Sequence, residues 1–476
     1  MVHRRVRSPS GPPLDFGAIR TELGVPGEFP AEVLAAADAA AQIPHPGSGD
    51  QIGDETGIAF VTIDPPGSMD LDQAVAIEDR PGGGWRVRYA IADVASWVEA
   101  GGPIDLEARR RTQTFYAPDQ RTPLHPPVLG EAAASLLPDG DRPAVVWTID
   151  VDGDGETTEV GVARAMVRSR ARLDYHGVQA DLDAGRGPEV LRPLPALGTA
   201  LVAASTRRGA IELGLPEQEV VTGPDGHWRV ELRRDPPTAQ WNAEISLLTG
   251  RAAAALMLVA KVGLLRTLPQ PDPAQFPRLR RAAANLAIPW PEGTSPAAVL
   301  AGLDTTRPTD ATFADLAAEL LRGAGYTALA GIAPTDPGHA GVGAPYAHVT
   351  APLRRLADRF ATETCLAIVA GVEVPEWVRA ALPELPALMA QGDHLAHGLD
   401  RAVVDVTEAF VLSDRVGDTF DASVLETGDR YGTVVLTEPA VKGRCDARDL
   451  PLGGSVRVRC TVADVAGRTV RFERVA

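Results

Sequence analysis

The sequence predicts an α+β protein made of a large domain, in which strands precede helices, and a small C-terminal barrel of five strands. Apolar, β-branched runs recur in the first third of the chain, and alanine-rich runs with helical spacing dominate its middle. From residue 413 onward the chain returns to short alternating segments separated by turns. At 476 residues it is long enough for two or three folded units. We expect three parts, namely an N-terminal region at 1–55, a large mixed-sheet domain at 56–412 and the barrel at 413–476.

The N-terminal region is expected to consist of a basic arm and one short helix. Residues 1–12 combine Arg4, Arg5 and Arg7 with a Ser-Pro-Ser-Gly-Pro-Pro run, which is typical of a flexible basic arm. An alanine-rich stretch from Ala31 to Ala41 follows Pro30 and predicts a short helix. A Gly/Pro-rich link then leads to the first strand.

Buried strands are predicted at 57–64 and 85–94, and a hairpin at 145–167. In that hairpin Asp150, Asp152, Asp154 and Gly155 match the first half of a calcium-binding loop. The twelfth position, which needs a bidentate glutamate, is a glycine, and the flanks have strand patterns. We therefore favour a solvated hairpin turn over a calcium site.

Alanine-rich runs with helical spacing predict helices at 241–265, 276–287 and 311–325. The tail has alternating segments at 415–438, 443–450, 455–465 and 468–476, a pattern typical of a five-stranded OB barrel. It carries ten basic and ten acidic residues, so the negative charge of the chain lies upstream.

Composition excludes several classes. The net charge of −17 rules out an overall basic surface but permits a local positive channel. Three cysteines without a Cys-x-x-Cys pair argue against a disulfide scaffold or a cysteine-rich zinc site, and favour a reducing, cytoplasmic setting. The N-terminus lacks the apolar region of a secretory signal. The longest apolar stretch, 252–265, includes Lys261 and is too short to span a bilayer, so we expect no membrane association.

The strongest chemical feature is Ile-Asp-Pro-Pro-Gly-Ser-Met-Asp-Leu-Asp-Gln, which places Asp64, Asp70 and Asp72 within nine residues. The alternation with Met69 and Leu71 lets the two later aspartates share one face of the loop. Three converging carboxylates repel each other unless a cation neutralises them, and oxygen ligands favour Mg²⁺ or Mn²⁺. The alternative from the residues alone is a polar loop with capping aspartates.

Six segments together resemble the RNase II / RNB family of processive 3′→5′ exoribonucleases, and they occur in the family's order. They are the aspartate loop at 60–78 and the stretches at 89–127, 134–144, 207–217, 241–253 and 338–358. The tail is similar to the ribosomal-type OB domain that often closes such proteins. The resemblance implies metal-dependent hydrolysis of single-stranded RNA from its 3′ end to nucleoside 5′-monophosphates, with Mg²⁺ or Mn²⁺ as cofactor.

The resemblance also implies roles for the loop residues. Asp64, Asp70 and Asp72 match three of the four signature aspartates; Asp64 and Asp70 would hold the metal, and Asp72 would be the carboxylate most needed for the chemical step. The fourth position is Gln73, whose amide oxygen would be a weaker ligand than the usual carboxylate.

Further residues match other family motifs. Arg354 matches an arginine near the scissile phosphate, and its neighbour Arg355 is a second candidate for binding the substrate. Tyr116 matches a tyrosine that contacts the terminal nucleotide, and Glu244 a glutamate near the 3′ terminus. For each of these the alternative is a structural role. His348 also lies in a family motif, but a structural histidine is the preferred interpretation.

The sequence departs from the family in three places. Ala351, Pro352 and Leu353 replace the usual Ser-Pro-Ile, and Leu356 replaces an aromatic residue. The region before residue 56 is too short for the cold-shock domains of classical members. Because of these changes and Gln73, the runner-up is an RNB-fold RNA-binding protein with lost or residual catalysis, and a third possibility is a phosphodiesterase acting on DNA or small nucleotides.

The positive charge is almost entirely arginine, since only Lys261 and Lys442 are lysines. Arginine is suited to forked phosphate contacts. We therefore expect an acidic exterior around an arginine-lined channel.

Overall fold

The structure is a computed structural model that describes residues 14–43, 52–214, 217–222, 228–233, 235–305, 307–332 and 334–475. The expected basic arm and the Gly/Pro-rich link before the first strand lie outside these residues.

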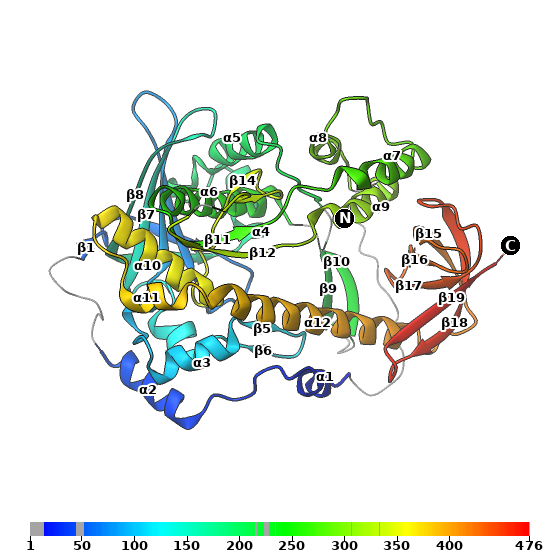
Figure 1. Ribbon diagram of the computed structural model, residues 1–476, viewed down its shortest axis with the longest axis horizontal. Helices are drawn as coiled ribbons and strands as arrows, with labels where there is room; N and C mark the ends of the chain where they lie inside the picture. The colour runs from blue at the N-terminus through cyan, green and yellow to red at the C-terminus, as the bar shows by residue number, and fades with distance from the viewer. Residues whose placement is uncertain are drawn as a thin grey trace.

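A six-stranded mixed sheet forms the centre of the large domain (Figure 1). The order is β1-β8-β2-β3-β4-β7, and β8 also pairs with β7, so the sheet curls back on itself. β8 runs parallel to β1 and β2 and antiparallel to β7, which makes the sheet mixed, as expected. The strands are β1 (Gly53–Asp54), β2 (Phe60–Ile63), β3 (Gln73–Asp79), β4 (Trp85–Ala92), β7 (Asp141–Val151) and β8 (Thr157–Leu173). The predicted strands and the hairpin around residues 152–156 are confirmed.

Both faces of this sheet are buried, and alternation along β3 shows how. Val75 and Ile77 enter one apolar cluster, whereas Ala74 and Ala76 enter another. The first cluster includes residues of α5 (Leu194–Arg207), α6 (Pro237–Ala260) and α10 (Leu356–Ala370). The second includes α2 (Ala31–Ala41), the predicted helix, and the first turn of α3 (Pro103–Arg111), together with the 3₁₀ helix Val94–Ser96 and the π-helix Leu129–Ala133.

The predicted helix at 241–265 is wrong at its C-terminal end. α6 stops at Ala260 because Lys261 adopts a left-handed conformation, with φ 55°, and β11 (Val262–Thr267) follows in antiparallel pairing with β12 (Gly325–Ala330). At Gly263, with φ 135°, a Cβ would lie 2.1 Å from Met257 Sδ, so the chain turns tightly against its own helix. α6 is long and apolar enough to cross a membrane by length and composition, but half of that window is buried inside this domain.

The remaining elements surround this body. α1 (Phe16–Leu23), which the sequence did not predict, packs on α12 (Leu385–Val411) through Phe16 and Ile19. Helices α7 (Phe276–Asn285), α8 (Pro296–Ala301) and α9 (Pro308–Ala317) form a separate apolar cluster. The others are α4 (Tyr175–Asp183), α11 (Glu376–Ala381) and the strand pairs β5 (Phe115–Tyr116) with β6 (Arg121–Thr122), β9 (Glu217–Thr222) with β10 (Trp228–Arg233), and β13 (Gly338–His339) with β14 (Ala344–Pro345).

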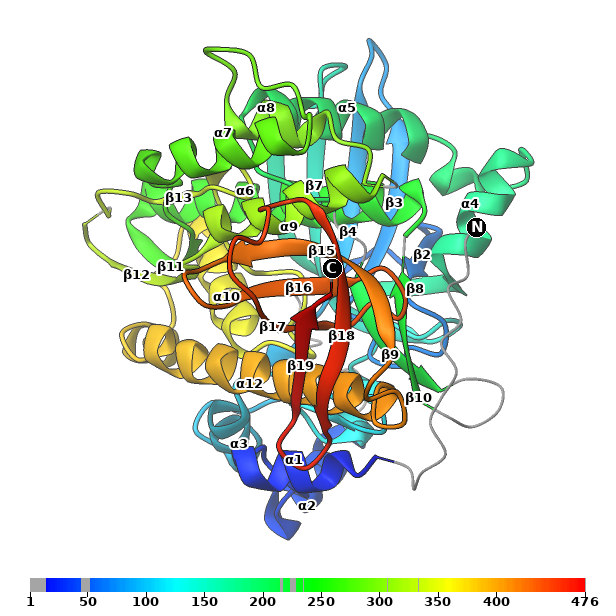
Figure 2. The ribbon, with the colours of Figure 1, turned by 90° about the vertical axis from the view of Figure 1, so that its right-hand side faces the viewer.

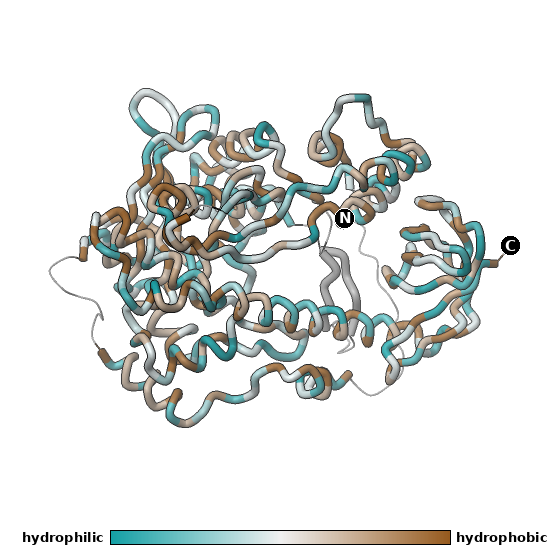
Figure 3. The backbone as a smooth tube through the Cα atoms, in the orientation of Figure 1, coloured by the Kyte–Doolittle hydropathy of each residue, from teal (hydrophilic) through white to brown (hydrophobic). Residues whose placement is uncertain are grey.

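The C-terminal residues form a closed five-stranded barrel, as predicted, in the order β15-β16-β17-β19-β18. Figure 2 shows it in front of the large domain. Inward and outward residues alternate along its strands, which appear as brown and teal in Figure 3. The strands are β15 (Thr419–Thr427), β16 (Gly432–Leu436), β17 (Lys442–Asp446), β18 (Ser455–Asp464) and β19 (Thr469–Arg474).

α12 runs from the large domain to the barrel (Figure 1). Its last turn joins the barrel core, where Ala409 and Leu412 are fully buried. The buried Glu408 accepts a hydrogen bond from the backbone N–H of Lys442 at 2.8 Å. The helix and the barrel are therefore packed as one body.

Candidate active site

The aspartate loop joins β2 to β3 and is anchored by a serine from a distant segment. Ser135 Oγ accepts the Leu71 N–H at 2.9 Å and donates to the Met69 carbonyl at 2.6 Å. Leu71 itself is fully buried. Leu71 therefore anchors the loop between Asp70 and Asp72.

Asp72 is the most deeply placed carboxylate of the loop, with 2% of its surface exposed. Its Oδ1 accepts the Leu353 N–H at 2.7 Å, and its Oδ2 lies 3.4 Å from Arg354 Nε. Burial raises the pKa of Asp72 well above its ordinary value, although Arg354 and the Leu353 amide oppose that shift. The structure thus brings Asp72 and Arg354 together, as predicted.

Asp64 and Asp70 carry the two other loop carboxylates. Burial raises the pKa of Asp64 to about 6, with a smaller contribution in the same direction from Asp70, while Arg354 lowers it. One buried oxygen of Asp64, Oδ2, accepts no hydrogen bond from the described residues. Asp70 is instead paired with Arg121, whose Nη1 lies 2.7 Å from Asp70 Oδ1.

Tyr116 and Arg354 form the open side of this group. Half of each side chain is exposed, and the Tyr116 hydroxyl interacts with the Arg354 guanidinium. Their backbones are aligned because the Thr114 N–H donates to the Arg354 carbonyl at 3.0 Å. An aromatic ring and a guanidinium therefore border the buried carboxylates.

Gln73, the first residue of β3, uses both ends of its amide within the protein. Its Nε2 donates to the Thr350 carbonyl at 2.5 Å, and its Oε1 accepts from the Tyr89 hydroxyl at 3.0 Å. The Tyr89 oxygen also lies 2.8 Å from Ser246 Oγ of α6.

Two of the candidate residues, Arg355 and Glu244, make their contacts with side chains outside this group. Arg355 is held by Asp358 through two hydrogen bonds of 2.6 and 2.8 Å. Glu244, on α6, lies among Glu212, Arg208 and Arg251, and burial raises its pKa to about 7. His348 is partly buried, and its Nδ1 lies 2.7 Å from the Tyr326 hydroxyl, an arrangement that agrees with the structural interpretation.

Sequence reasoning missed four residues that organise the site, namely Arg121, Ser135, Tyr89 and Ser246. Arg121 and Ser135 lie in segments that resemble the family, but nothing in a single sequence pairs them with a loop 51 to 66 residues away.

The carboxylates fit a Mg²⁺ or Mn²⁺ ion that takes few protein ligands. Among the described residues no three His, Cys, Asp or Glu side chains form a group that could hold a metal by themselves. Mg²⁺ is commonly bound by one or two carboxylates, with water and substrate phosphates completing the shell. The buried Asp64 oxygen without a hydrogen-bond donor, together with the neighbouring Asp70, matches this kind of site.

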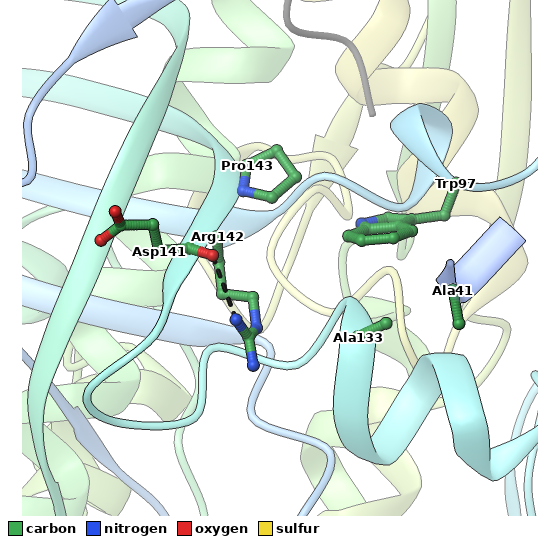
Figure 4. Close-up of a pocket in the computed structure, with 6 residues that line it drawn as sticks. All are labelled: Ala41, Trp97, Ala133, Asp141, Arg142 and Pro143. Atoms are coloured by element: carbon green, nitrogen blue, oxygen red, sulfur yellow. Dashed lines mark hydrogen bonds between the residues drawn. The ribbon is translucent and has the colours of Figure 1, made fainter. Parts of the chain in front are cut away.

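A cavity of about 230 Å³ lies apart from these residues, on the face of the sheet covered by α2 (Figure 4). It is lined by Ala41, Trp97, Ala133, Asp141, Arg142 and Pro143. None of the predicted site residues lines it. The expected arginine-lined channel stays a prediction.

Comparison with known proteins identifies the family. The RNB domain matches residues 54–368, which is more than half of the chain. The chain belongs to the RNB family. Residues 418–475 match the RNase II-type exonuclease C-terminal S1 domain, in agreement with the predicted OB barrel.

Curated RNB relatives include ribonuclease R of Escherichia coli, which is 31% identical over 316 residues covering 63% of this chain and 38% of the relative. Ribonuclease R of Aquifex aeolicus is 26% identical over 456 residues, covering 87% of this chain and 63% of the relative. The chain thus spans about two fifths of the length of the first of these proteins.

Two solved structures share the fold of this RNB protein. One is Mycoplasma genitalium RNase R in complex with ribose-methylated single-stranded RNA, with a TM-score of 0.85 and 20% identity over 97% of this chain and 77% of that one. The other is yeast Ssd1, described as a pseudonuclease, with a TM-score of 0.66 and 18% identity over 86% of this chain and 52% of that one.

Proposed function

We propose that this RNB protein is a metal-dependent 3′→5′ exoribonuclease that hydrolyses single-stranded RNA to nucleoside 5′-monophosphates. The observation that carries the proposal is the contact between Asp72 and Arg354, in which a buried carboxylate faces a half-exposed guanidinium beside Asp64. The family membership and the names of the ribonuclease R relatives support the same reaction.

In this proposal Asp64 and Asp70 hold the Mg²⁺ or Mn²⁺ ion, and water and substrate phosphate complete its shell. When bound, the ion would activate water and stabilise charge on the phosphate. The chain's own residues supply position and charge. Arg354 binds the scissile phosphate, where a guanidinium can make paired hydrogen bonds and offset charge that develops in the transition state.

Tyr116 and Asp72 have different tasks. The half-exposed ring of Tyr116 stacks on the terminal base, which suits degradation without sequence preference. Asp72 keeps Oδ2 toward the phosphate side, because the Leu353 amide occupies Oδ1, and Oδ2 is the oxygen placed to accept a proton from the attacking water. Glu244 and Arg355 are bonded elsewhere in the protein, so any contact they make with RNA lies outside this step.

The direct test uses a 5′-labelled oligoribonucleotide with Mg²⁺ or Mn²⁺, the unmodified protein and an Asp72→Asn variant. We expect stepwise shortening by the unmodified protein and loss of about 100-fold or more of the rate in the variant, because a neutral amide cannot accept the proton. RNA binding, measured by fluorescence anisotropy, should be retained in both proteins. Equal cleavage of the matching deoxyribonucleotide would instead indicate a general phosphodiesterase.

A second candidate is an RNB-fold RNA-binding protein without catalysis. It is favoured by Gln73 in place of the family's fourth aspartate and by the shared fold with a protein described as a pseudonuclease. Retained RNA binding with no shortening under any metal would select it. The proposal also includes a cytoplasmic setting, which cell fractionation tests. It includes a division of the chain at residues 56 and 413, which limited proteolysis tests.

A further inference from the structure

Gln73 replaces a family metal ligand, yet its surroundings fit an amide and not a carboxylate. Gln73 and Tyr89 lie on the same face of adjacent strands, since Gln73 pairs with Ile91 and Tyr89 is two residues away on β4. Tyr89 is 1% exposed, so its hydroxyl needs a partner inside the protein, and the Gln73 oxygen is that partner at 3.0 Å.

The hydrogen bonds run in one direction across four segments. Since the Tyr89 proton goes to Gln73 Oε1, Ser246 donates to the Tyr89 oxygen, and Gln73 Nε2 donates in turn to the Thr350 carbonyl. Tyr89 on β4 and Gln73 on β3 each use one donor and one acceptor in this series. An aspartate at position 73 would be one methylene shorter and would present a second acceptor to the Thr350 carbonyl.

The Thr350 carbonyl begins the segment that carries the arginine. Leu353 in this segment donates its N–H to Asp72, the residue before Gln73, and Arg354 faces the other Asp72 oxygen. Two consecutive side chains, Asp72 and Gln73, therefore hold the segment 350–354 at both ends.

We propose that Gln73 is a positioning residue that fixes the segment 350–354, and with it Arg354, against Asp72, and that it does not bind the metal. Asp64 and Asp70 then make up the protein's contribution to the ion. This inference rests on the proposed function for its catalytic consequence, but its structural content can be measured without catalysis.

The experiment compares Gln73→Met, which has similar length and neither donor nor acceptor, with Gln73→Glu, which keeps only acceptors. Tyr89→Phe removes one hydroxyl and is the milder variant if the others fold poorly. Gln179→Met is the matched control. The Gln179 amide oxygen accepts hydrogen bonds from Thr238 at the start of α6 and makes no contact with the segment 350–354 among the hydrogen bonds described. Two quantities are measured on RNA-free protein, namely Mn²⁺ affinity by electron paramagnetic resonance and hydrogen exchange of residues 350–356.

We expect Gln73→Met and Gln73→Glu to speed hydrogen exchange in this segment by about tenfold or more, and Tyr89→Phe to speed it less, because a partly buried hydrogen bond is lost. Mn²⁺ affinity should stay within about twofold of the unmodified protein in Gln73→Met and Tyr89→Phe, since no ligand is removed. In the RNA assay Gln73→Met should lower kcat and leave KM unchanged.

Weaker Mn²⁺ binding by Gln73→Met would overturn the proposal, because it would identify Gln73 as a ligand. Unchanged exchange at 350–356 in both Gln73 variants would overturn it as well. If the unmodified protein cleaves no RNA, the proposed function fails, but the exchange and Mn²⁺ results still decide the role of Gln73.

Discussion

Arg121 binds Asp70 through Nη1 at 2.7 Å and Glu131 through Nη2 at 2.7 Å, so one guanidinium bridges a loop carboxylate and the π-helix. The charge of Arg121 opposes a divalent cation at Asp70. We predict that Arg121→Met raises Mn²⁺ affinity by about threefold or more, because Asp70 is released and a repulsive charge is removed. Isothermal titration in low salt measures this.

Glu131→Gln is the control for that change. It removes the other partner of Arg121 and leaves the guanidinium on Asp70, so Mn²⁺ affinity should not rise. Weaker Mn²⁺ binding by Arg121→Met would mean that Arg121 orients Asp70 for the metal and does not compete with it.

Tyr116→Ala should lengthen the shortest RNA left at the end of the reaction. Stacking of an aromatic ring on a base contributes about 1–3 kcal/mol, and short products depend on it most because they make few other contacts. Electrophoresis of 5′-labelled products measures this, with Tyr116→Phe as the control that keeps the ring. An unchanged product ladder would assign Tyr116 a structural role only.

Glu244 makes stability depend on pH. Burial raises its pKa from 4.5 to about 7, so the folded protein binds this proton more tightly than the unfolded chain does. The resulting stability is complete below about pH 4.5 and is lost as the pH rises through about 7. Glu244→Gln, which stays neutral, should therefore be more stable than the unmodified protein at pH 8, by about 1–3 kcal/mol.

Thermal unfolding of both proteins at pH 5 and pH 8 checks this prediction. Glu212→Gln should show a smaller effect in the same direction, because Glu212 adds to the shift without being the buried group. Equal stability differences at the two pH values would contradict a buried, titrating Glu244.

Gly250→Ala should destabilise the large domain. A Cβ on this residue of α6 would lie 2.1 Å from Tyr346 Cε2 and 2.5 Å from the Ala347 carbonyl oxygen, which belongs to the backbone. Overpacking of this kind costs about 1–3 kcal/mol and exceeds the helix preference for alanine. Gly398→Ala on α12, where a Cβ meets nothing within 4 Å, should be neutral or stabilising. A lower midpoint of thermal unfolding for Gly250→Ala alone is the expected result.

Much of the fold follows from local patterns in the sequence. The helix Ala31–Ala41, the strands β2 and β4 and the five-stranded barrel were predictable, because the hydrophobic period and the turn residues of these segments agree with their burial. The strand β3, which follows the aspartate loop, was not predicted. The end of α6 was not, since Leu264 and Leu265 continue an apolar run and only pairing with β12 makes them a strand. α1 was missed, although Asp15 and Gly24 cap it at either end.

The candidate site was predictable only in part. The resemblance assigns Asp72 and Arg354 to one site, and the structure brings these residues together across 282 positions. The sequence does not indicate that Asp358 binds Arg355 or that Tyr89 binds Gln73, because such partners depend on which side chains tertiary packing brings together.

α12 determines how the barrel is attached to the large domain. Twenty-seven residues of helix extend for about 40 Å, with α1 packed along one side and the barrel core fused to the last turn. The barrel thus packs directly on the end of a continuous helix. A strand of RNA that contacted both the barrel and Tyr116 would have to span a fixed distance. Only RNA above a certain length could then make both contacts.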